Sequence, residues 1–236
     1  MVNSDGAAGT GRLFVVATPI GNLGDAAPPS IEVLKSVDAI AAEDTRRTRK
    51  LLAHFGITTR LLAYHDHNEE RASRELLERI EGGEDIALVS DAGTPLVADP
   101  GYRLVSSCAE RGLEVVAVPG PSAVVAALSI AGLPPQPFHF AGYLPRKSGQ
   151  RRTRLASLAG LPCTVVYYES PHRITAALKD MHEVLGDRKA VVARELTKVH
   201  EEVLRGTLGE LSAVAERRTL KGEIVVVVGG PGKDEA

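Results

Sequence analysis

Short apolar runs alternate with longer amphipathic segments along nearly the whole chain. The runs are rich in Val, Ile and Ala, which is typical of strands, whereas the longer segments repeat apolar residues every three or four positions, as helices do. Several runs, such as residues 224–228, contain only apolar residues, as expected for strands that helices cover on both faces. The pattern predicts an α/β fold with parallel or mostly parallel sheets.

Nine strands and eight helices are predicted from this pattern. The predicted strands cover residues 13–18, 38–42, 60–64, 85–90, 114–118, 138–142, 163–168, 190–195 and 223–228. The predicted helices cover residues 30–36, 45–55, 70–81, 102–111, 123–130, 151–158, 173–185 and 208–217.

A proline-rich segment, GLPPQP at residues 132–137, interrupts the alternation. Its three prolines end the preceding helix and hold the chain extended, because proline lacks an amide proton and fixes its own φ. We therefore expect a domain boundary at this segment or just before it. The expected N-terminal α/β domain covers residues 12–122 with five strands, and the expected C-terminal α/β domain covers residues 123–230 with four.

Three turns that follow predicted strands are small, polar and rich in glycine: residues 18–25, 90–101 and 118–123. Ligands of open α/β sheets bind beyond the carboxyl ends of strands, and glycine lets the backbone approach a ligand closely. Any one of these turns is explained by ordinary turn chemistry, but three at corresponding strand ends favour a binding crevice. No GxGxxG follows the first strand and no GxxxxGK[ST] occurs, so a standard nucleotide site is disfavoured.

Two further strand ends carry acids and histidines. Glu43 and Asp44 follow the second strand, and the run YHDHNE, with His65 and His67, follows the third. Without a third anchoring motif the histidines are a weak metal signal, and general-base duty or hydrogen bonding to a substrate is as plausible. In the second half, Glu169 is placed to cap a helix, to pair with a nearby arginine, or to orient a substrate hydroxyl.

Composition bounds the class of protein. The 236 residues include 44% hydrophobic ones, enough for packed cores, and only two cysteines without CxxC spacing. A disulfide scaffold and a zinc module are therefore excluded, and a reducing cytoplasm is the expected compartment. Residues 1–11 lack a basic region and the apolar run 13–17 is short, so we expect no signal peptide and no membrane partner.

Charge is unevenly distributed, although the formal total is only −2. Nine of the 28 basic residues fall in two stretches without acids, TRRTRK at 45–50 and RKSGQRRTR at 146–154. The rest of the chain therefore carries 19 basic residues against 30 acidic ones and is strongly acidic. Such stretches fit an electrostatic footprint for phosphates. The candidate RNA-binding residues are Arg46, Arg47, Lys50, Arg146, Lys147, Arg151 and Arg152. Only 9 residues are aromatic, so phosphate and shape recognition is expected in place of a base-stacking platform.

The order of motifs resembles the ribosomal RNA small subunit methyltransferase I family of the tetrapyrrole-methylase superfamily, over about residues 13–230. The motifs are VATPIGNLGD, AEDTRRTRKLL, YHDHNE, VSDAGTPLVADPGYRLV, VPGPSAVVAALSIAGLP, FAGYLPRK, YYESPHRI, RELTKVHEE and GEIVVVVGG. The resemblance implies S-adenosylmethionine-dependent methylation of the ribose 2′-hydroxyl of a cytidine in the decoding region of 16S rRNA. It also implies two α/β domains with the cofactor cleft between them, a homodimer, and 16S rRNA or the small ribosomal subunit as partner.

Carried over by motif, the resemblance implies cofactor contacts in the three glycine-rich turns and at two later strand ends. These residues are Pro19, Asp91, Ala92, Gly93, Thr94, Leu96, Ser122, Ala123, Tyr168 and Leu196. No metal is expected.

A sulfonium methyl group is already electrophilic, so catalysis should come from alignment and from a base that removes the hydroxyl proton. Glu43, Asp44 and His65 are the candidates for base or orienting group, with Arg46, Arg47 and Lys50 holding flanking phosphates. Two alternatives stay open: methylation of a tetrapyrrole or other small molecule on the same scaffold, and a non-enzymatic RNA-associated scaffold.

Overall fold

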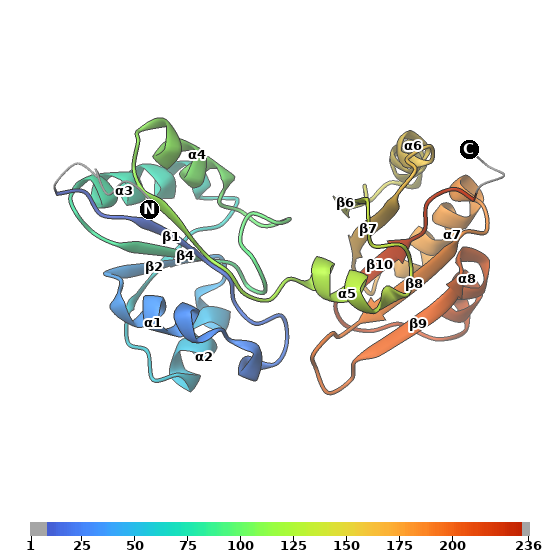
Figure 1. The fold of residues 1–236 in the computed structure, drawn as a ribbon, viewed down its shortest axis with the longest axis horizontal. Helices are drawn as coiled ribbons and strands as arrows, with labels where there is room; N and C mark the ends of the chain where they lie inside the picture. Colours follow the sequence, from blue (N-terminus) through green and yellow to red (C-terminus); the bar gives the residue numbers. More distant parts are fainter. Residues whose placement is uncertain (1–8, 233–236) are drawn as a thin grey trace. The chain divides into compact units, whose positions relative to one another are not determined.

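The computed structural model describes residues 9–232, and the chain divides into two compact units, one ending at Ser122 and one beginning at Ala123 (Figure 1). The expectation for residues 1–11 lies mostly outside the described residues. No helix in residues 9–232 is both long and apolar enough to cross a bilayer.

The first unit is built on a five-stranded sheet with the order β3-β2-β4-β1-β5, in which all pairings are parallel. Every predicted element of this unit is present, with shifts of a few residues at the ends. The elements are β1 (Leu13–Val16), the 3-10 helix η1 (Leu23–Asp25), α1 (Pro28–Ser36), β2 (Ala39–Ala42), α2 (Thr45–His54), β3 (Arg60–Ala63), α3 (Glu69–Glu81), β4 (Ile86–Val89), α4 (Tyr102–Glu110) and β5 (Val115–Val118).

Helices cover both faces of this sheet. Leu34 of α1 and Leu52 of α2 pack into the core on one face, and Leu76 of α3 and Leu104 of α4 pack into the core on the other. The central strands β2 and β4 are buried at every position. Their uniformly apolar sequences are explained by this double coverage.

The second unit also contains a five-stranded sheet, with the order β6-β7-β10-β8-β9. Here the expectation of a mostly parallel sheet is wrong, because only β6 and β7 pair in parallel and the other three pairings are antiparallel. The elements are α5 (Ala123–Ala131), β6 (Phe138–Tyr143), α6 (Ser148–Leu158), β7 (Thr164–Glu169), α7 (Ile174–Leu185), β8 (Lys189–Arg194), β9 (Glu202–Thr207), α8 (Leu208–Arg217) and β10 (Ile224–Val228).

β9 is the element that the apolar pattern missed. It is an edge strand that pairs only with β8, and none of its residues is fully buried. Its sequence, EVLRGT, is therefore mixed rather than apolar, and a strand of this kind carries no strong period-2 signal.

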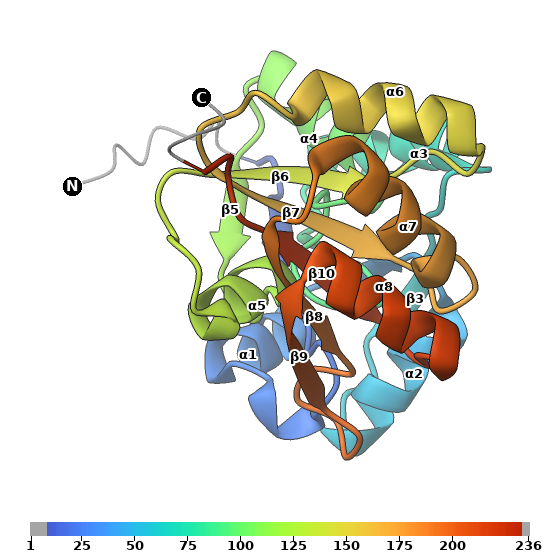
Figure 2. The ribbon, with the colours of Figure 1, turned by 90° about the vertical axis from the view of Figure 1, so that its right-hand side faces the viewer.

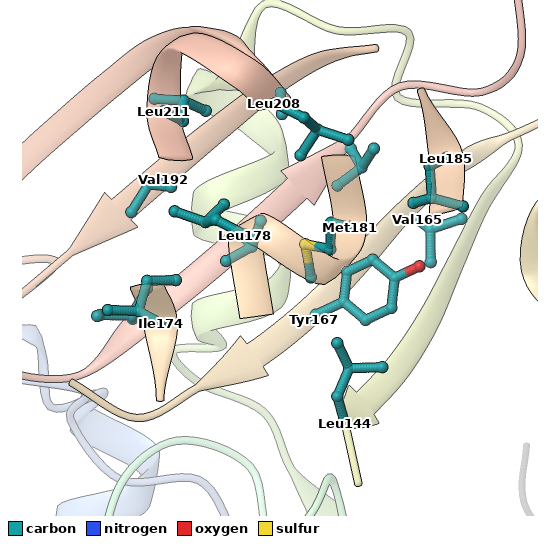
Figure 3. Close-up of a cluster of buried hydrophobic side chains, with 14 of the residues drawn as sticks. Leu144, Val165, Tyr167, Ile174, Leu178, Met181, Leu185, Val192, Leu208 and Leu211 are labelled. Carbon is teal, nitrogen blue, oxygen red and sulfur yellow. The ribbon is translucent and has the colours of Figure 1, made fainter. Parts of the chain in front are cut away.

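α6, α7 and α8 cover one face of the second sheet, as Figure 2 shows, and α5 packs on β10 and β8 from the other face. Their shared core includes Tyr167, which lies beside Met181, Val165 and Leu144 in Figure 3. Successive residues of a strand point to opposite faces, so Tyr168 lies on the α5 face of the sheet.

Candidate active site

The carboxyl ends of the five parallel strands of the first unit share one edge of the sheet. The neighbouring strands β1 and β4 continue into helices on opposite faces, α1 and α4. In open α/β sheets, ligands bind beyond the strand ends at a point where neighbouring connections diverge in this way. The turns after β1 and β4 flank one such point, and the turns after β2 and β4 flank another, because α2 and α4 also lie on opposite faces.

Hydrogen bonds join the three glycine-rich turns at this edge. The amide of Thr18 donates to the carbonyl of Gly93 at 2.8 Å, and the amide of Gly93 donates back to Thr18 at 3.1 Å. The hydroxyl of Thr94 donates to the carbonyl of Pro121 at 3.4 Å. The structure therefore brings together the turns that carry the predicted cofactor residues of this unit: Pro19, Asp91, Ala92, Gly93, Thr94, Leu96 and Ser122.

The turn after β4 contains unusual backbone conformations. Leu96 and Ala98 have φ of 71° and 69°, a region that non-glycine residues seldom occupy outside functional or tightly constrained segments. Gly93 has φ of 84°, and a Cβ at this position would lie 3.4 Å from Cγ2 of Ile20 and 3.7 Å from the carbonyl of Pro121. Glycine is thus favoured at Gly93 by its conformation, whereas a Cβ there would make only ordinary van der Waals contacts.

Glu43 lies directly after β2 among several acids. Burial raises the pKa of its carboxyl to about 7, and the charges of Asp99, Asp91 and Asp66 act in the same direction. Its Oε2 atom is buried and has no hydrogen-bond partner among the described residues. A carboxyl with a pKa close to neutral is suited to take up and release a proton, which is the property that a general base needs.

Asp44, the next residue, has a different role in the fold. Its carboxylate caps α2 by accepting from the amide of Arg46 at 2.8 Å, and it also accepts from the Arg46 guanidinium. These hydrogen bonds hold the pKa of Asp44 well below its usual range. The amide of Asp44 donates to Asp91 Oδ1 at 3.0 Å, and Arg47 lies 3.3 Å from Oδ2 of the same carboxylate. Asp91 therefore fixes the start of α2 to the turn after β4.

His65 lies after β3, which pairs with β2. Its backbone amide donates to the side chain of Asn68 at 2.8 Å, and its Nδ1 atom is buried with no hydrogen-bond partner among the described residues. The preceding residue, Tyr64, donates its amide to the carbonyl of Ala42, one position before Glu43. Glu43 and His65 thus follow neighbouring strand ends, and each has a buried polar atom without a partner. Within residues 9–232 no cluster of acids, histidines and cysteines has the geometry of a metal site.

The remaining predicted cofactor residues lie in the second unit. Ala123 begins α5, and Tyr168 follows the core residue Tyr167 in β7. Leu196 is buried between Glu195 and Thr197, which have φ of 52° and 64°. The second unit therefore also carries one of its predicted site residues in a strained turn after a strand.

The two basic stretches differ in how much of their charge is free. Arg46, Arg47 and Lys50 are exposed on α2, although the first two pair with Asp44 and Asp91. In the second stretch, Arg146 and Lys147 are exposed and have no acidic partner within the described residues.

Arg151 requires a correction. It is only 4% exposed, and its Nε donates to Oδ2 of the buried Asp180 at 2.7 Å. Asp180 also accepts from Arg152 at 2.8 Å and from the hydroxyl of Ser148 at 2.9 Å, and Arg152 pairs with Glu183 as well. Arg151 is a structural ion-pair partner and is not available to phosphate. The sequence pattern missed this because Asp180 lies on another helix, α7.

Sequence reasoning also overlooked the influence of Asp66 and Asp99 on Glu43. In the sequence both are polar residues of turns, and the available signal is their position after β3 and β4. Strands of a parallel sheet bring such turns to one edge, so the charges of Asp66 and Asp99 act on Glu43 and help to raise its pKa.

Several solved structures share this fold. Diphthine synthase superimposes with a TM-score of 0.72 at 18% identity, covering 92% of this chain and 90% of that chain. Uroporphyrin-III C-methyl transferase from Thermus thermophilus, complexed with S-adenyl homocysteine, superimposes with a TM-score of 0.66 at 19% identity, covering 93% of this chain and 97% of that chain. At these identities the likeness establishes the fold.

Sequence relatives are much closer. The chain is 51% identical over 229 residues to ribosomal RNA small subunit methyltransferase I of Xylella fastidiosa, covering 96% of this chain and 84% of the relative. It is 51% identical over 223 residues to the protein of the same name from Escherichia coli O157:H7, covering 93% and 78%. The family model of tetrapyrrole (corrin/porphyrin) methylases matches residues 12–212. The chain therefore belongs to the tetrapyrrole methylase family and, within it, to the ribosomal RNA small subunit methyltransferase I family.

Proposed function

We propose that this protein transfers a methyl group from S-adenosylmethionine to the ribose 2′-hydroxyl of a cytidine in the decoding region of 16S rRNA. The reaction class and cofactor follow from the family, and the RNA substrate follows from the names of relatives at about half identity over most of the chain. The observation that carries the chemistry is Glu43, a half-buried carboxyl with a pKa raised to about 7 and an unpartnered buried oxygen.

The residues of the first unit fit a bound cofactor. Gly93 has a positive φ of 84° and no side chain to keep a ligand from its backbone, and the turns that surround it are already joined by hydrogen bonds. We propose that Pro19, the turn from Asp91 to Thr94, Leu96 and Ser122 hold the cofactor in this unit, with Ala123, Tyr168 and Leu196 as its contacts in the second. When bound, S-adenosylmethionine supplies an electrophilic methyl group on a positively charged sulfur.

The chain has to hold the ribose and take up its proton. We propose that Glu43, in its ionised form, accepts the 2′-hydroxyl proton at Oε2. His65 would orient the ribose through its Nδ1 atom, which is also buried and has no partner among the described residues. Asp44 is a weaker candidate for the base, because its carboxylate already accepts three hydrogen bonds that favour the ionised form. Its proposed role is to position Arg46 and the start of α2.

RNA recognition is proposed to depend on phosphate contacts by Arg46, Arg47 and Lys50 in the first unit and by Arg146, Lys147 and Arg152 in the second. Arg152 is only partly available, since two acids hold it. A homodimer acting in the cytoplasm on the small ribosomal subunit or its rRNA completes the proposal. Sedimentation of the purified protein would test the dimer.

The function is tested by supplying labelled S-adenosylmethionine with 30S particles, or with naked 16S rRNA, from a strain that lacks this activity. Label in rRNA that maps to one cytidine of the decoding region and resists alkaline hydrolysis there would support the proposal. Label transferred to a corrin or porphyrin but not to rRNA would establish the small-molecule alternative, and no binding of S-adenosylmethionine in calorimetry would favour the non-enzymatic one.

Substituting Gly93 by Ala tests the cofactor turn. The variant should lose about 1 kcal/mol of unfolding free energy, because a residue with a side chain is strained at positive φ. It should also bind S-adenosylmethionine several-fold more weakly in calorimetry. Gly56→Ala is the matched control: Gly56 also has positive φ, 63°, and a Cβ there would meet nothing within 4 Å. Equal cofactor affinity in the two variants would remove this turn from the binding site.

The salt dependence of rRNA binding tests the second basic stretch. Neutralising both residues in Arg146→Gln/Lys147→Gln should reduce the slope of log K against log salt by about one to two, since each lost phosphate contact removes ~0.7–0.9. Arg217→Gln/Arg218→Gln, in exposed positions around the end of α8, removes the same charge elsewhere in the same unit. If this control changes the slope equally, the effect reflects total charge alone and Arg146 and Lys147 are not contact residues.

A further inference from the structure

The end of β6 is displaced by an irregularity that changes which face its side chains occupy. Phe140 pairs with Val166 and Gly142 with Tyr167, so Ala141 is an extra residue in the ladder, and Gly142 has φ of 66°. One extra residue reverses the alternation that follows it. Tyr143, which would otherwise point into the helix-covered core, instead lies in register with Tyr168 and on the same face.

Because of this bulge, residues of β6 contribute side chains to both faces of the sheet. Ala141 and Leu144 remain on the core side, packed among the buried residues beneath α6 and α7. Phe140 and Tyr143 both reach the other face, where their rings pack edge-on against Tyr168 with centroid distances of 4.9 and 5.6 Å. Tyr143 remains 56% exposed although it is supported in this way. An exposed aromatic ring that is supported by a neighbouring ring is suited to stack on an unpaired base.

The segment after Tyr143 is held by a buried ion pair and carries exposed positive charge. Arg173 donates to the carbonyl of Leu144 and pairs with the buried Glu169 at 3.2 Å, so a buried ion pair holds this segment against the end of β7. Arg146 and Lys147 follow within a few residues and are exposed. The aromatic ring and the two cations together match the two components of a nucleotide, a base and its phosphate.

We propose that Tyr143 stacks on an unpaired base of the RNA substrate, while Arg146 and Lys147 bind the adjoining backbone phosphates. The proposal rests on the RNA-methyltransferase function above and adds a base contact to it. One exposed ring does not make a stacking platform, so the low aromatic content still excludes recognition of the kind that uses several stacked bases.

Substitutions at Tyr143 test this by steady-state methylation of the rRNA substrate that the wild-type protein accepts. Tyr143→Ala should lower kcat/KM for RNA by about tenfold or more, the effect of losing one base–aromatic stack, whereas Tyr143→Phe should stay within about threefold of wild type. The affinity for S-adenosylmethionine and the sedimentation behaviour should not change. Phe138→Ala is the matched control, because Phe138 is an exposed aromatic at the opposite end of β6, 44% exposed.

A direct readout is available because the chain has no tryptophan. In Tyr143→Trp the new indole is the sole one, and its fluorescence should be quenched when a transcribed 16S rRNA fragment is added with S-adenosylhomocysteine. The indole of Phe138→Trp should change little under the same conditions.

Several results would overturn the proposal. Tyr143→Ala with wild-type kcat/KM, or Tyr143→Phe as impaired as Tyr143→Ala, excludes stacking. A parallel loss of S-adenosylmethionine affinity assigns Tyr143 to the cofactor, and a changed sedimentation coefficient assigns it to contact between copies of the chain. Failure of the wild-type protein to methylate rRNA would instead contradict the proposed function, so the two failures are distinguishable.

Discussion

Replacing Glu43 by Gln should reduce the rate of methyl transfer by about 10²–10⁴-fold, the usual contribution of a general base. The rate should be measured in single turnover with S-adenosylmethionine saturating, so that binding does not mask the chemical step. The substitution keeps the size of the side chain and removes its ability to take a proton. It is therefore a sharper change than Glu43→Ala, which also leaves a space beside Asp91.

The pH dependence of the same reaction follows from the pKa of Glu43, which burial and neighbouring acids raise from 4.5 to about 7. A base must be ionised, so the wild-type rate should rise with pH and level off above about 7. In Glu43→Gln this rise should be absent. Asp44→Asn is the control: the pKa of Asp44 is lowered, so its loss should leave the pH dependence near neutrality in place.

Stability should change in the opposite direction from activity. Because Glu43 binds its proton more tightly in the folded protein than in the unfolded one, folding stability falls as pH rises from 4.5 to about 7 and stays reduced above that. Glu43→Gln has no such dependence, so it should melt at a higher temperature than wild type at about pH 8 and at nearly the same temperature as wild type at about pH 5.

An active Glu43→Gln variant would assign the base to another residue, and His65→Gln would be tested next.

Replacing Asp180 by Ala should lower the free energy of unfolding by about 3–5 kcal/mol, because it leaves the buried guanidinium of Arg151 without its anion. Asp180 is 3% exposed and accepts hydrogen bonds from Ser148, Arg151 and Arg152. Burial alone would raise the pKa of its carboxyl, but these hydrogen bonds outweigh burial and lower it. Its stabilising effect is therefore present above its ordinary pKa and is lost as pH falls through the lowered one.

Urea unfolding measures the loss of unfolding free energy in Asp180→Ala, and two further variants serve for comparison. Glu183→Ala removes the other carboxylate that pairs with Arg152, but its side chain is 38% exposed, so the loss should stay below about 1 kcal/mol. The paired replacement Arg151→Met/Asp180→Leu should be less destabilised than Asp180→Ala, because it leaves no unpaired buried charge. A small effect of Asp180→Ala would show that Arg151 can move to solvent.

The α/β class, and most of the elements, could be predicted from the sequence because local patterns determine them. Each buried strand of the first unit is an apolar run, and parallel strands need helical connections that have their own period. The direction of strand pairing in the second unit could not be predicted, because β10 has the same uniformly apolar sequence whether its neighbours run parallel or antiparallel. β9 was missed since an edge strand with half-exposed residues has no apolar run.

The candidate site was predictable where it depends on turns after strands and unpredictable where it depends on distant partners. The three glycine-rich turns lie at one edge of the first sheet, as their positions predict. Whether a charge is free cannot be read locally: Arg146 and Arg151 belong to one basic stretch, yet one is exposed and the other is buried against Asp180. The bulge at Ala141, which turns Tyr143 outward, also depends on pairing with another strand, β7.

The paired hydrogen bonds between Thr18 and Gly93 have a thermodynamic consequence for ligand affinity. Two free loops that became ordered only around a ligand would lose backbone entropy worth about 1–2 kcal/mol per residue, and that loss would be subtracted from the binding energy. Here both turns become ordered when the first unit folds, so the loss of backbone entropy lowers the folding stability and not the affinity for the ligand. Contacts between these turns and a ligand then contribute to affinity without an entropy cost for ordering the loops.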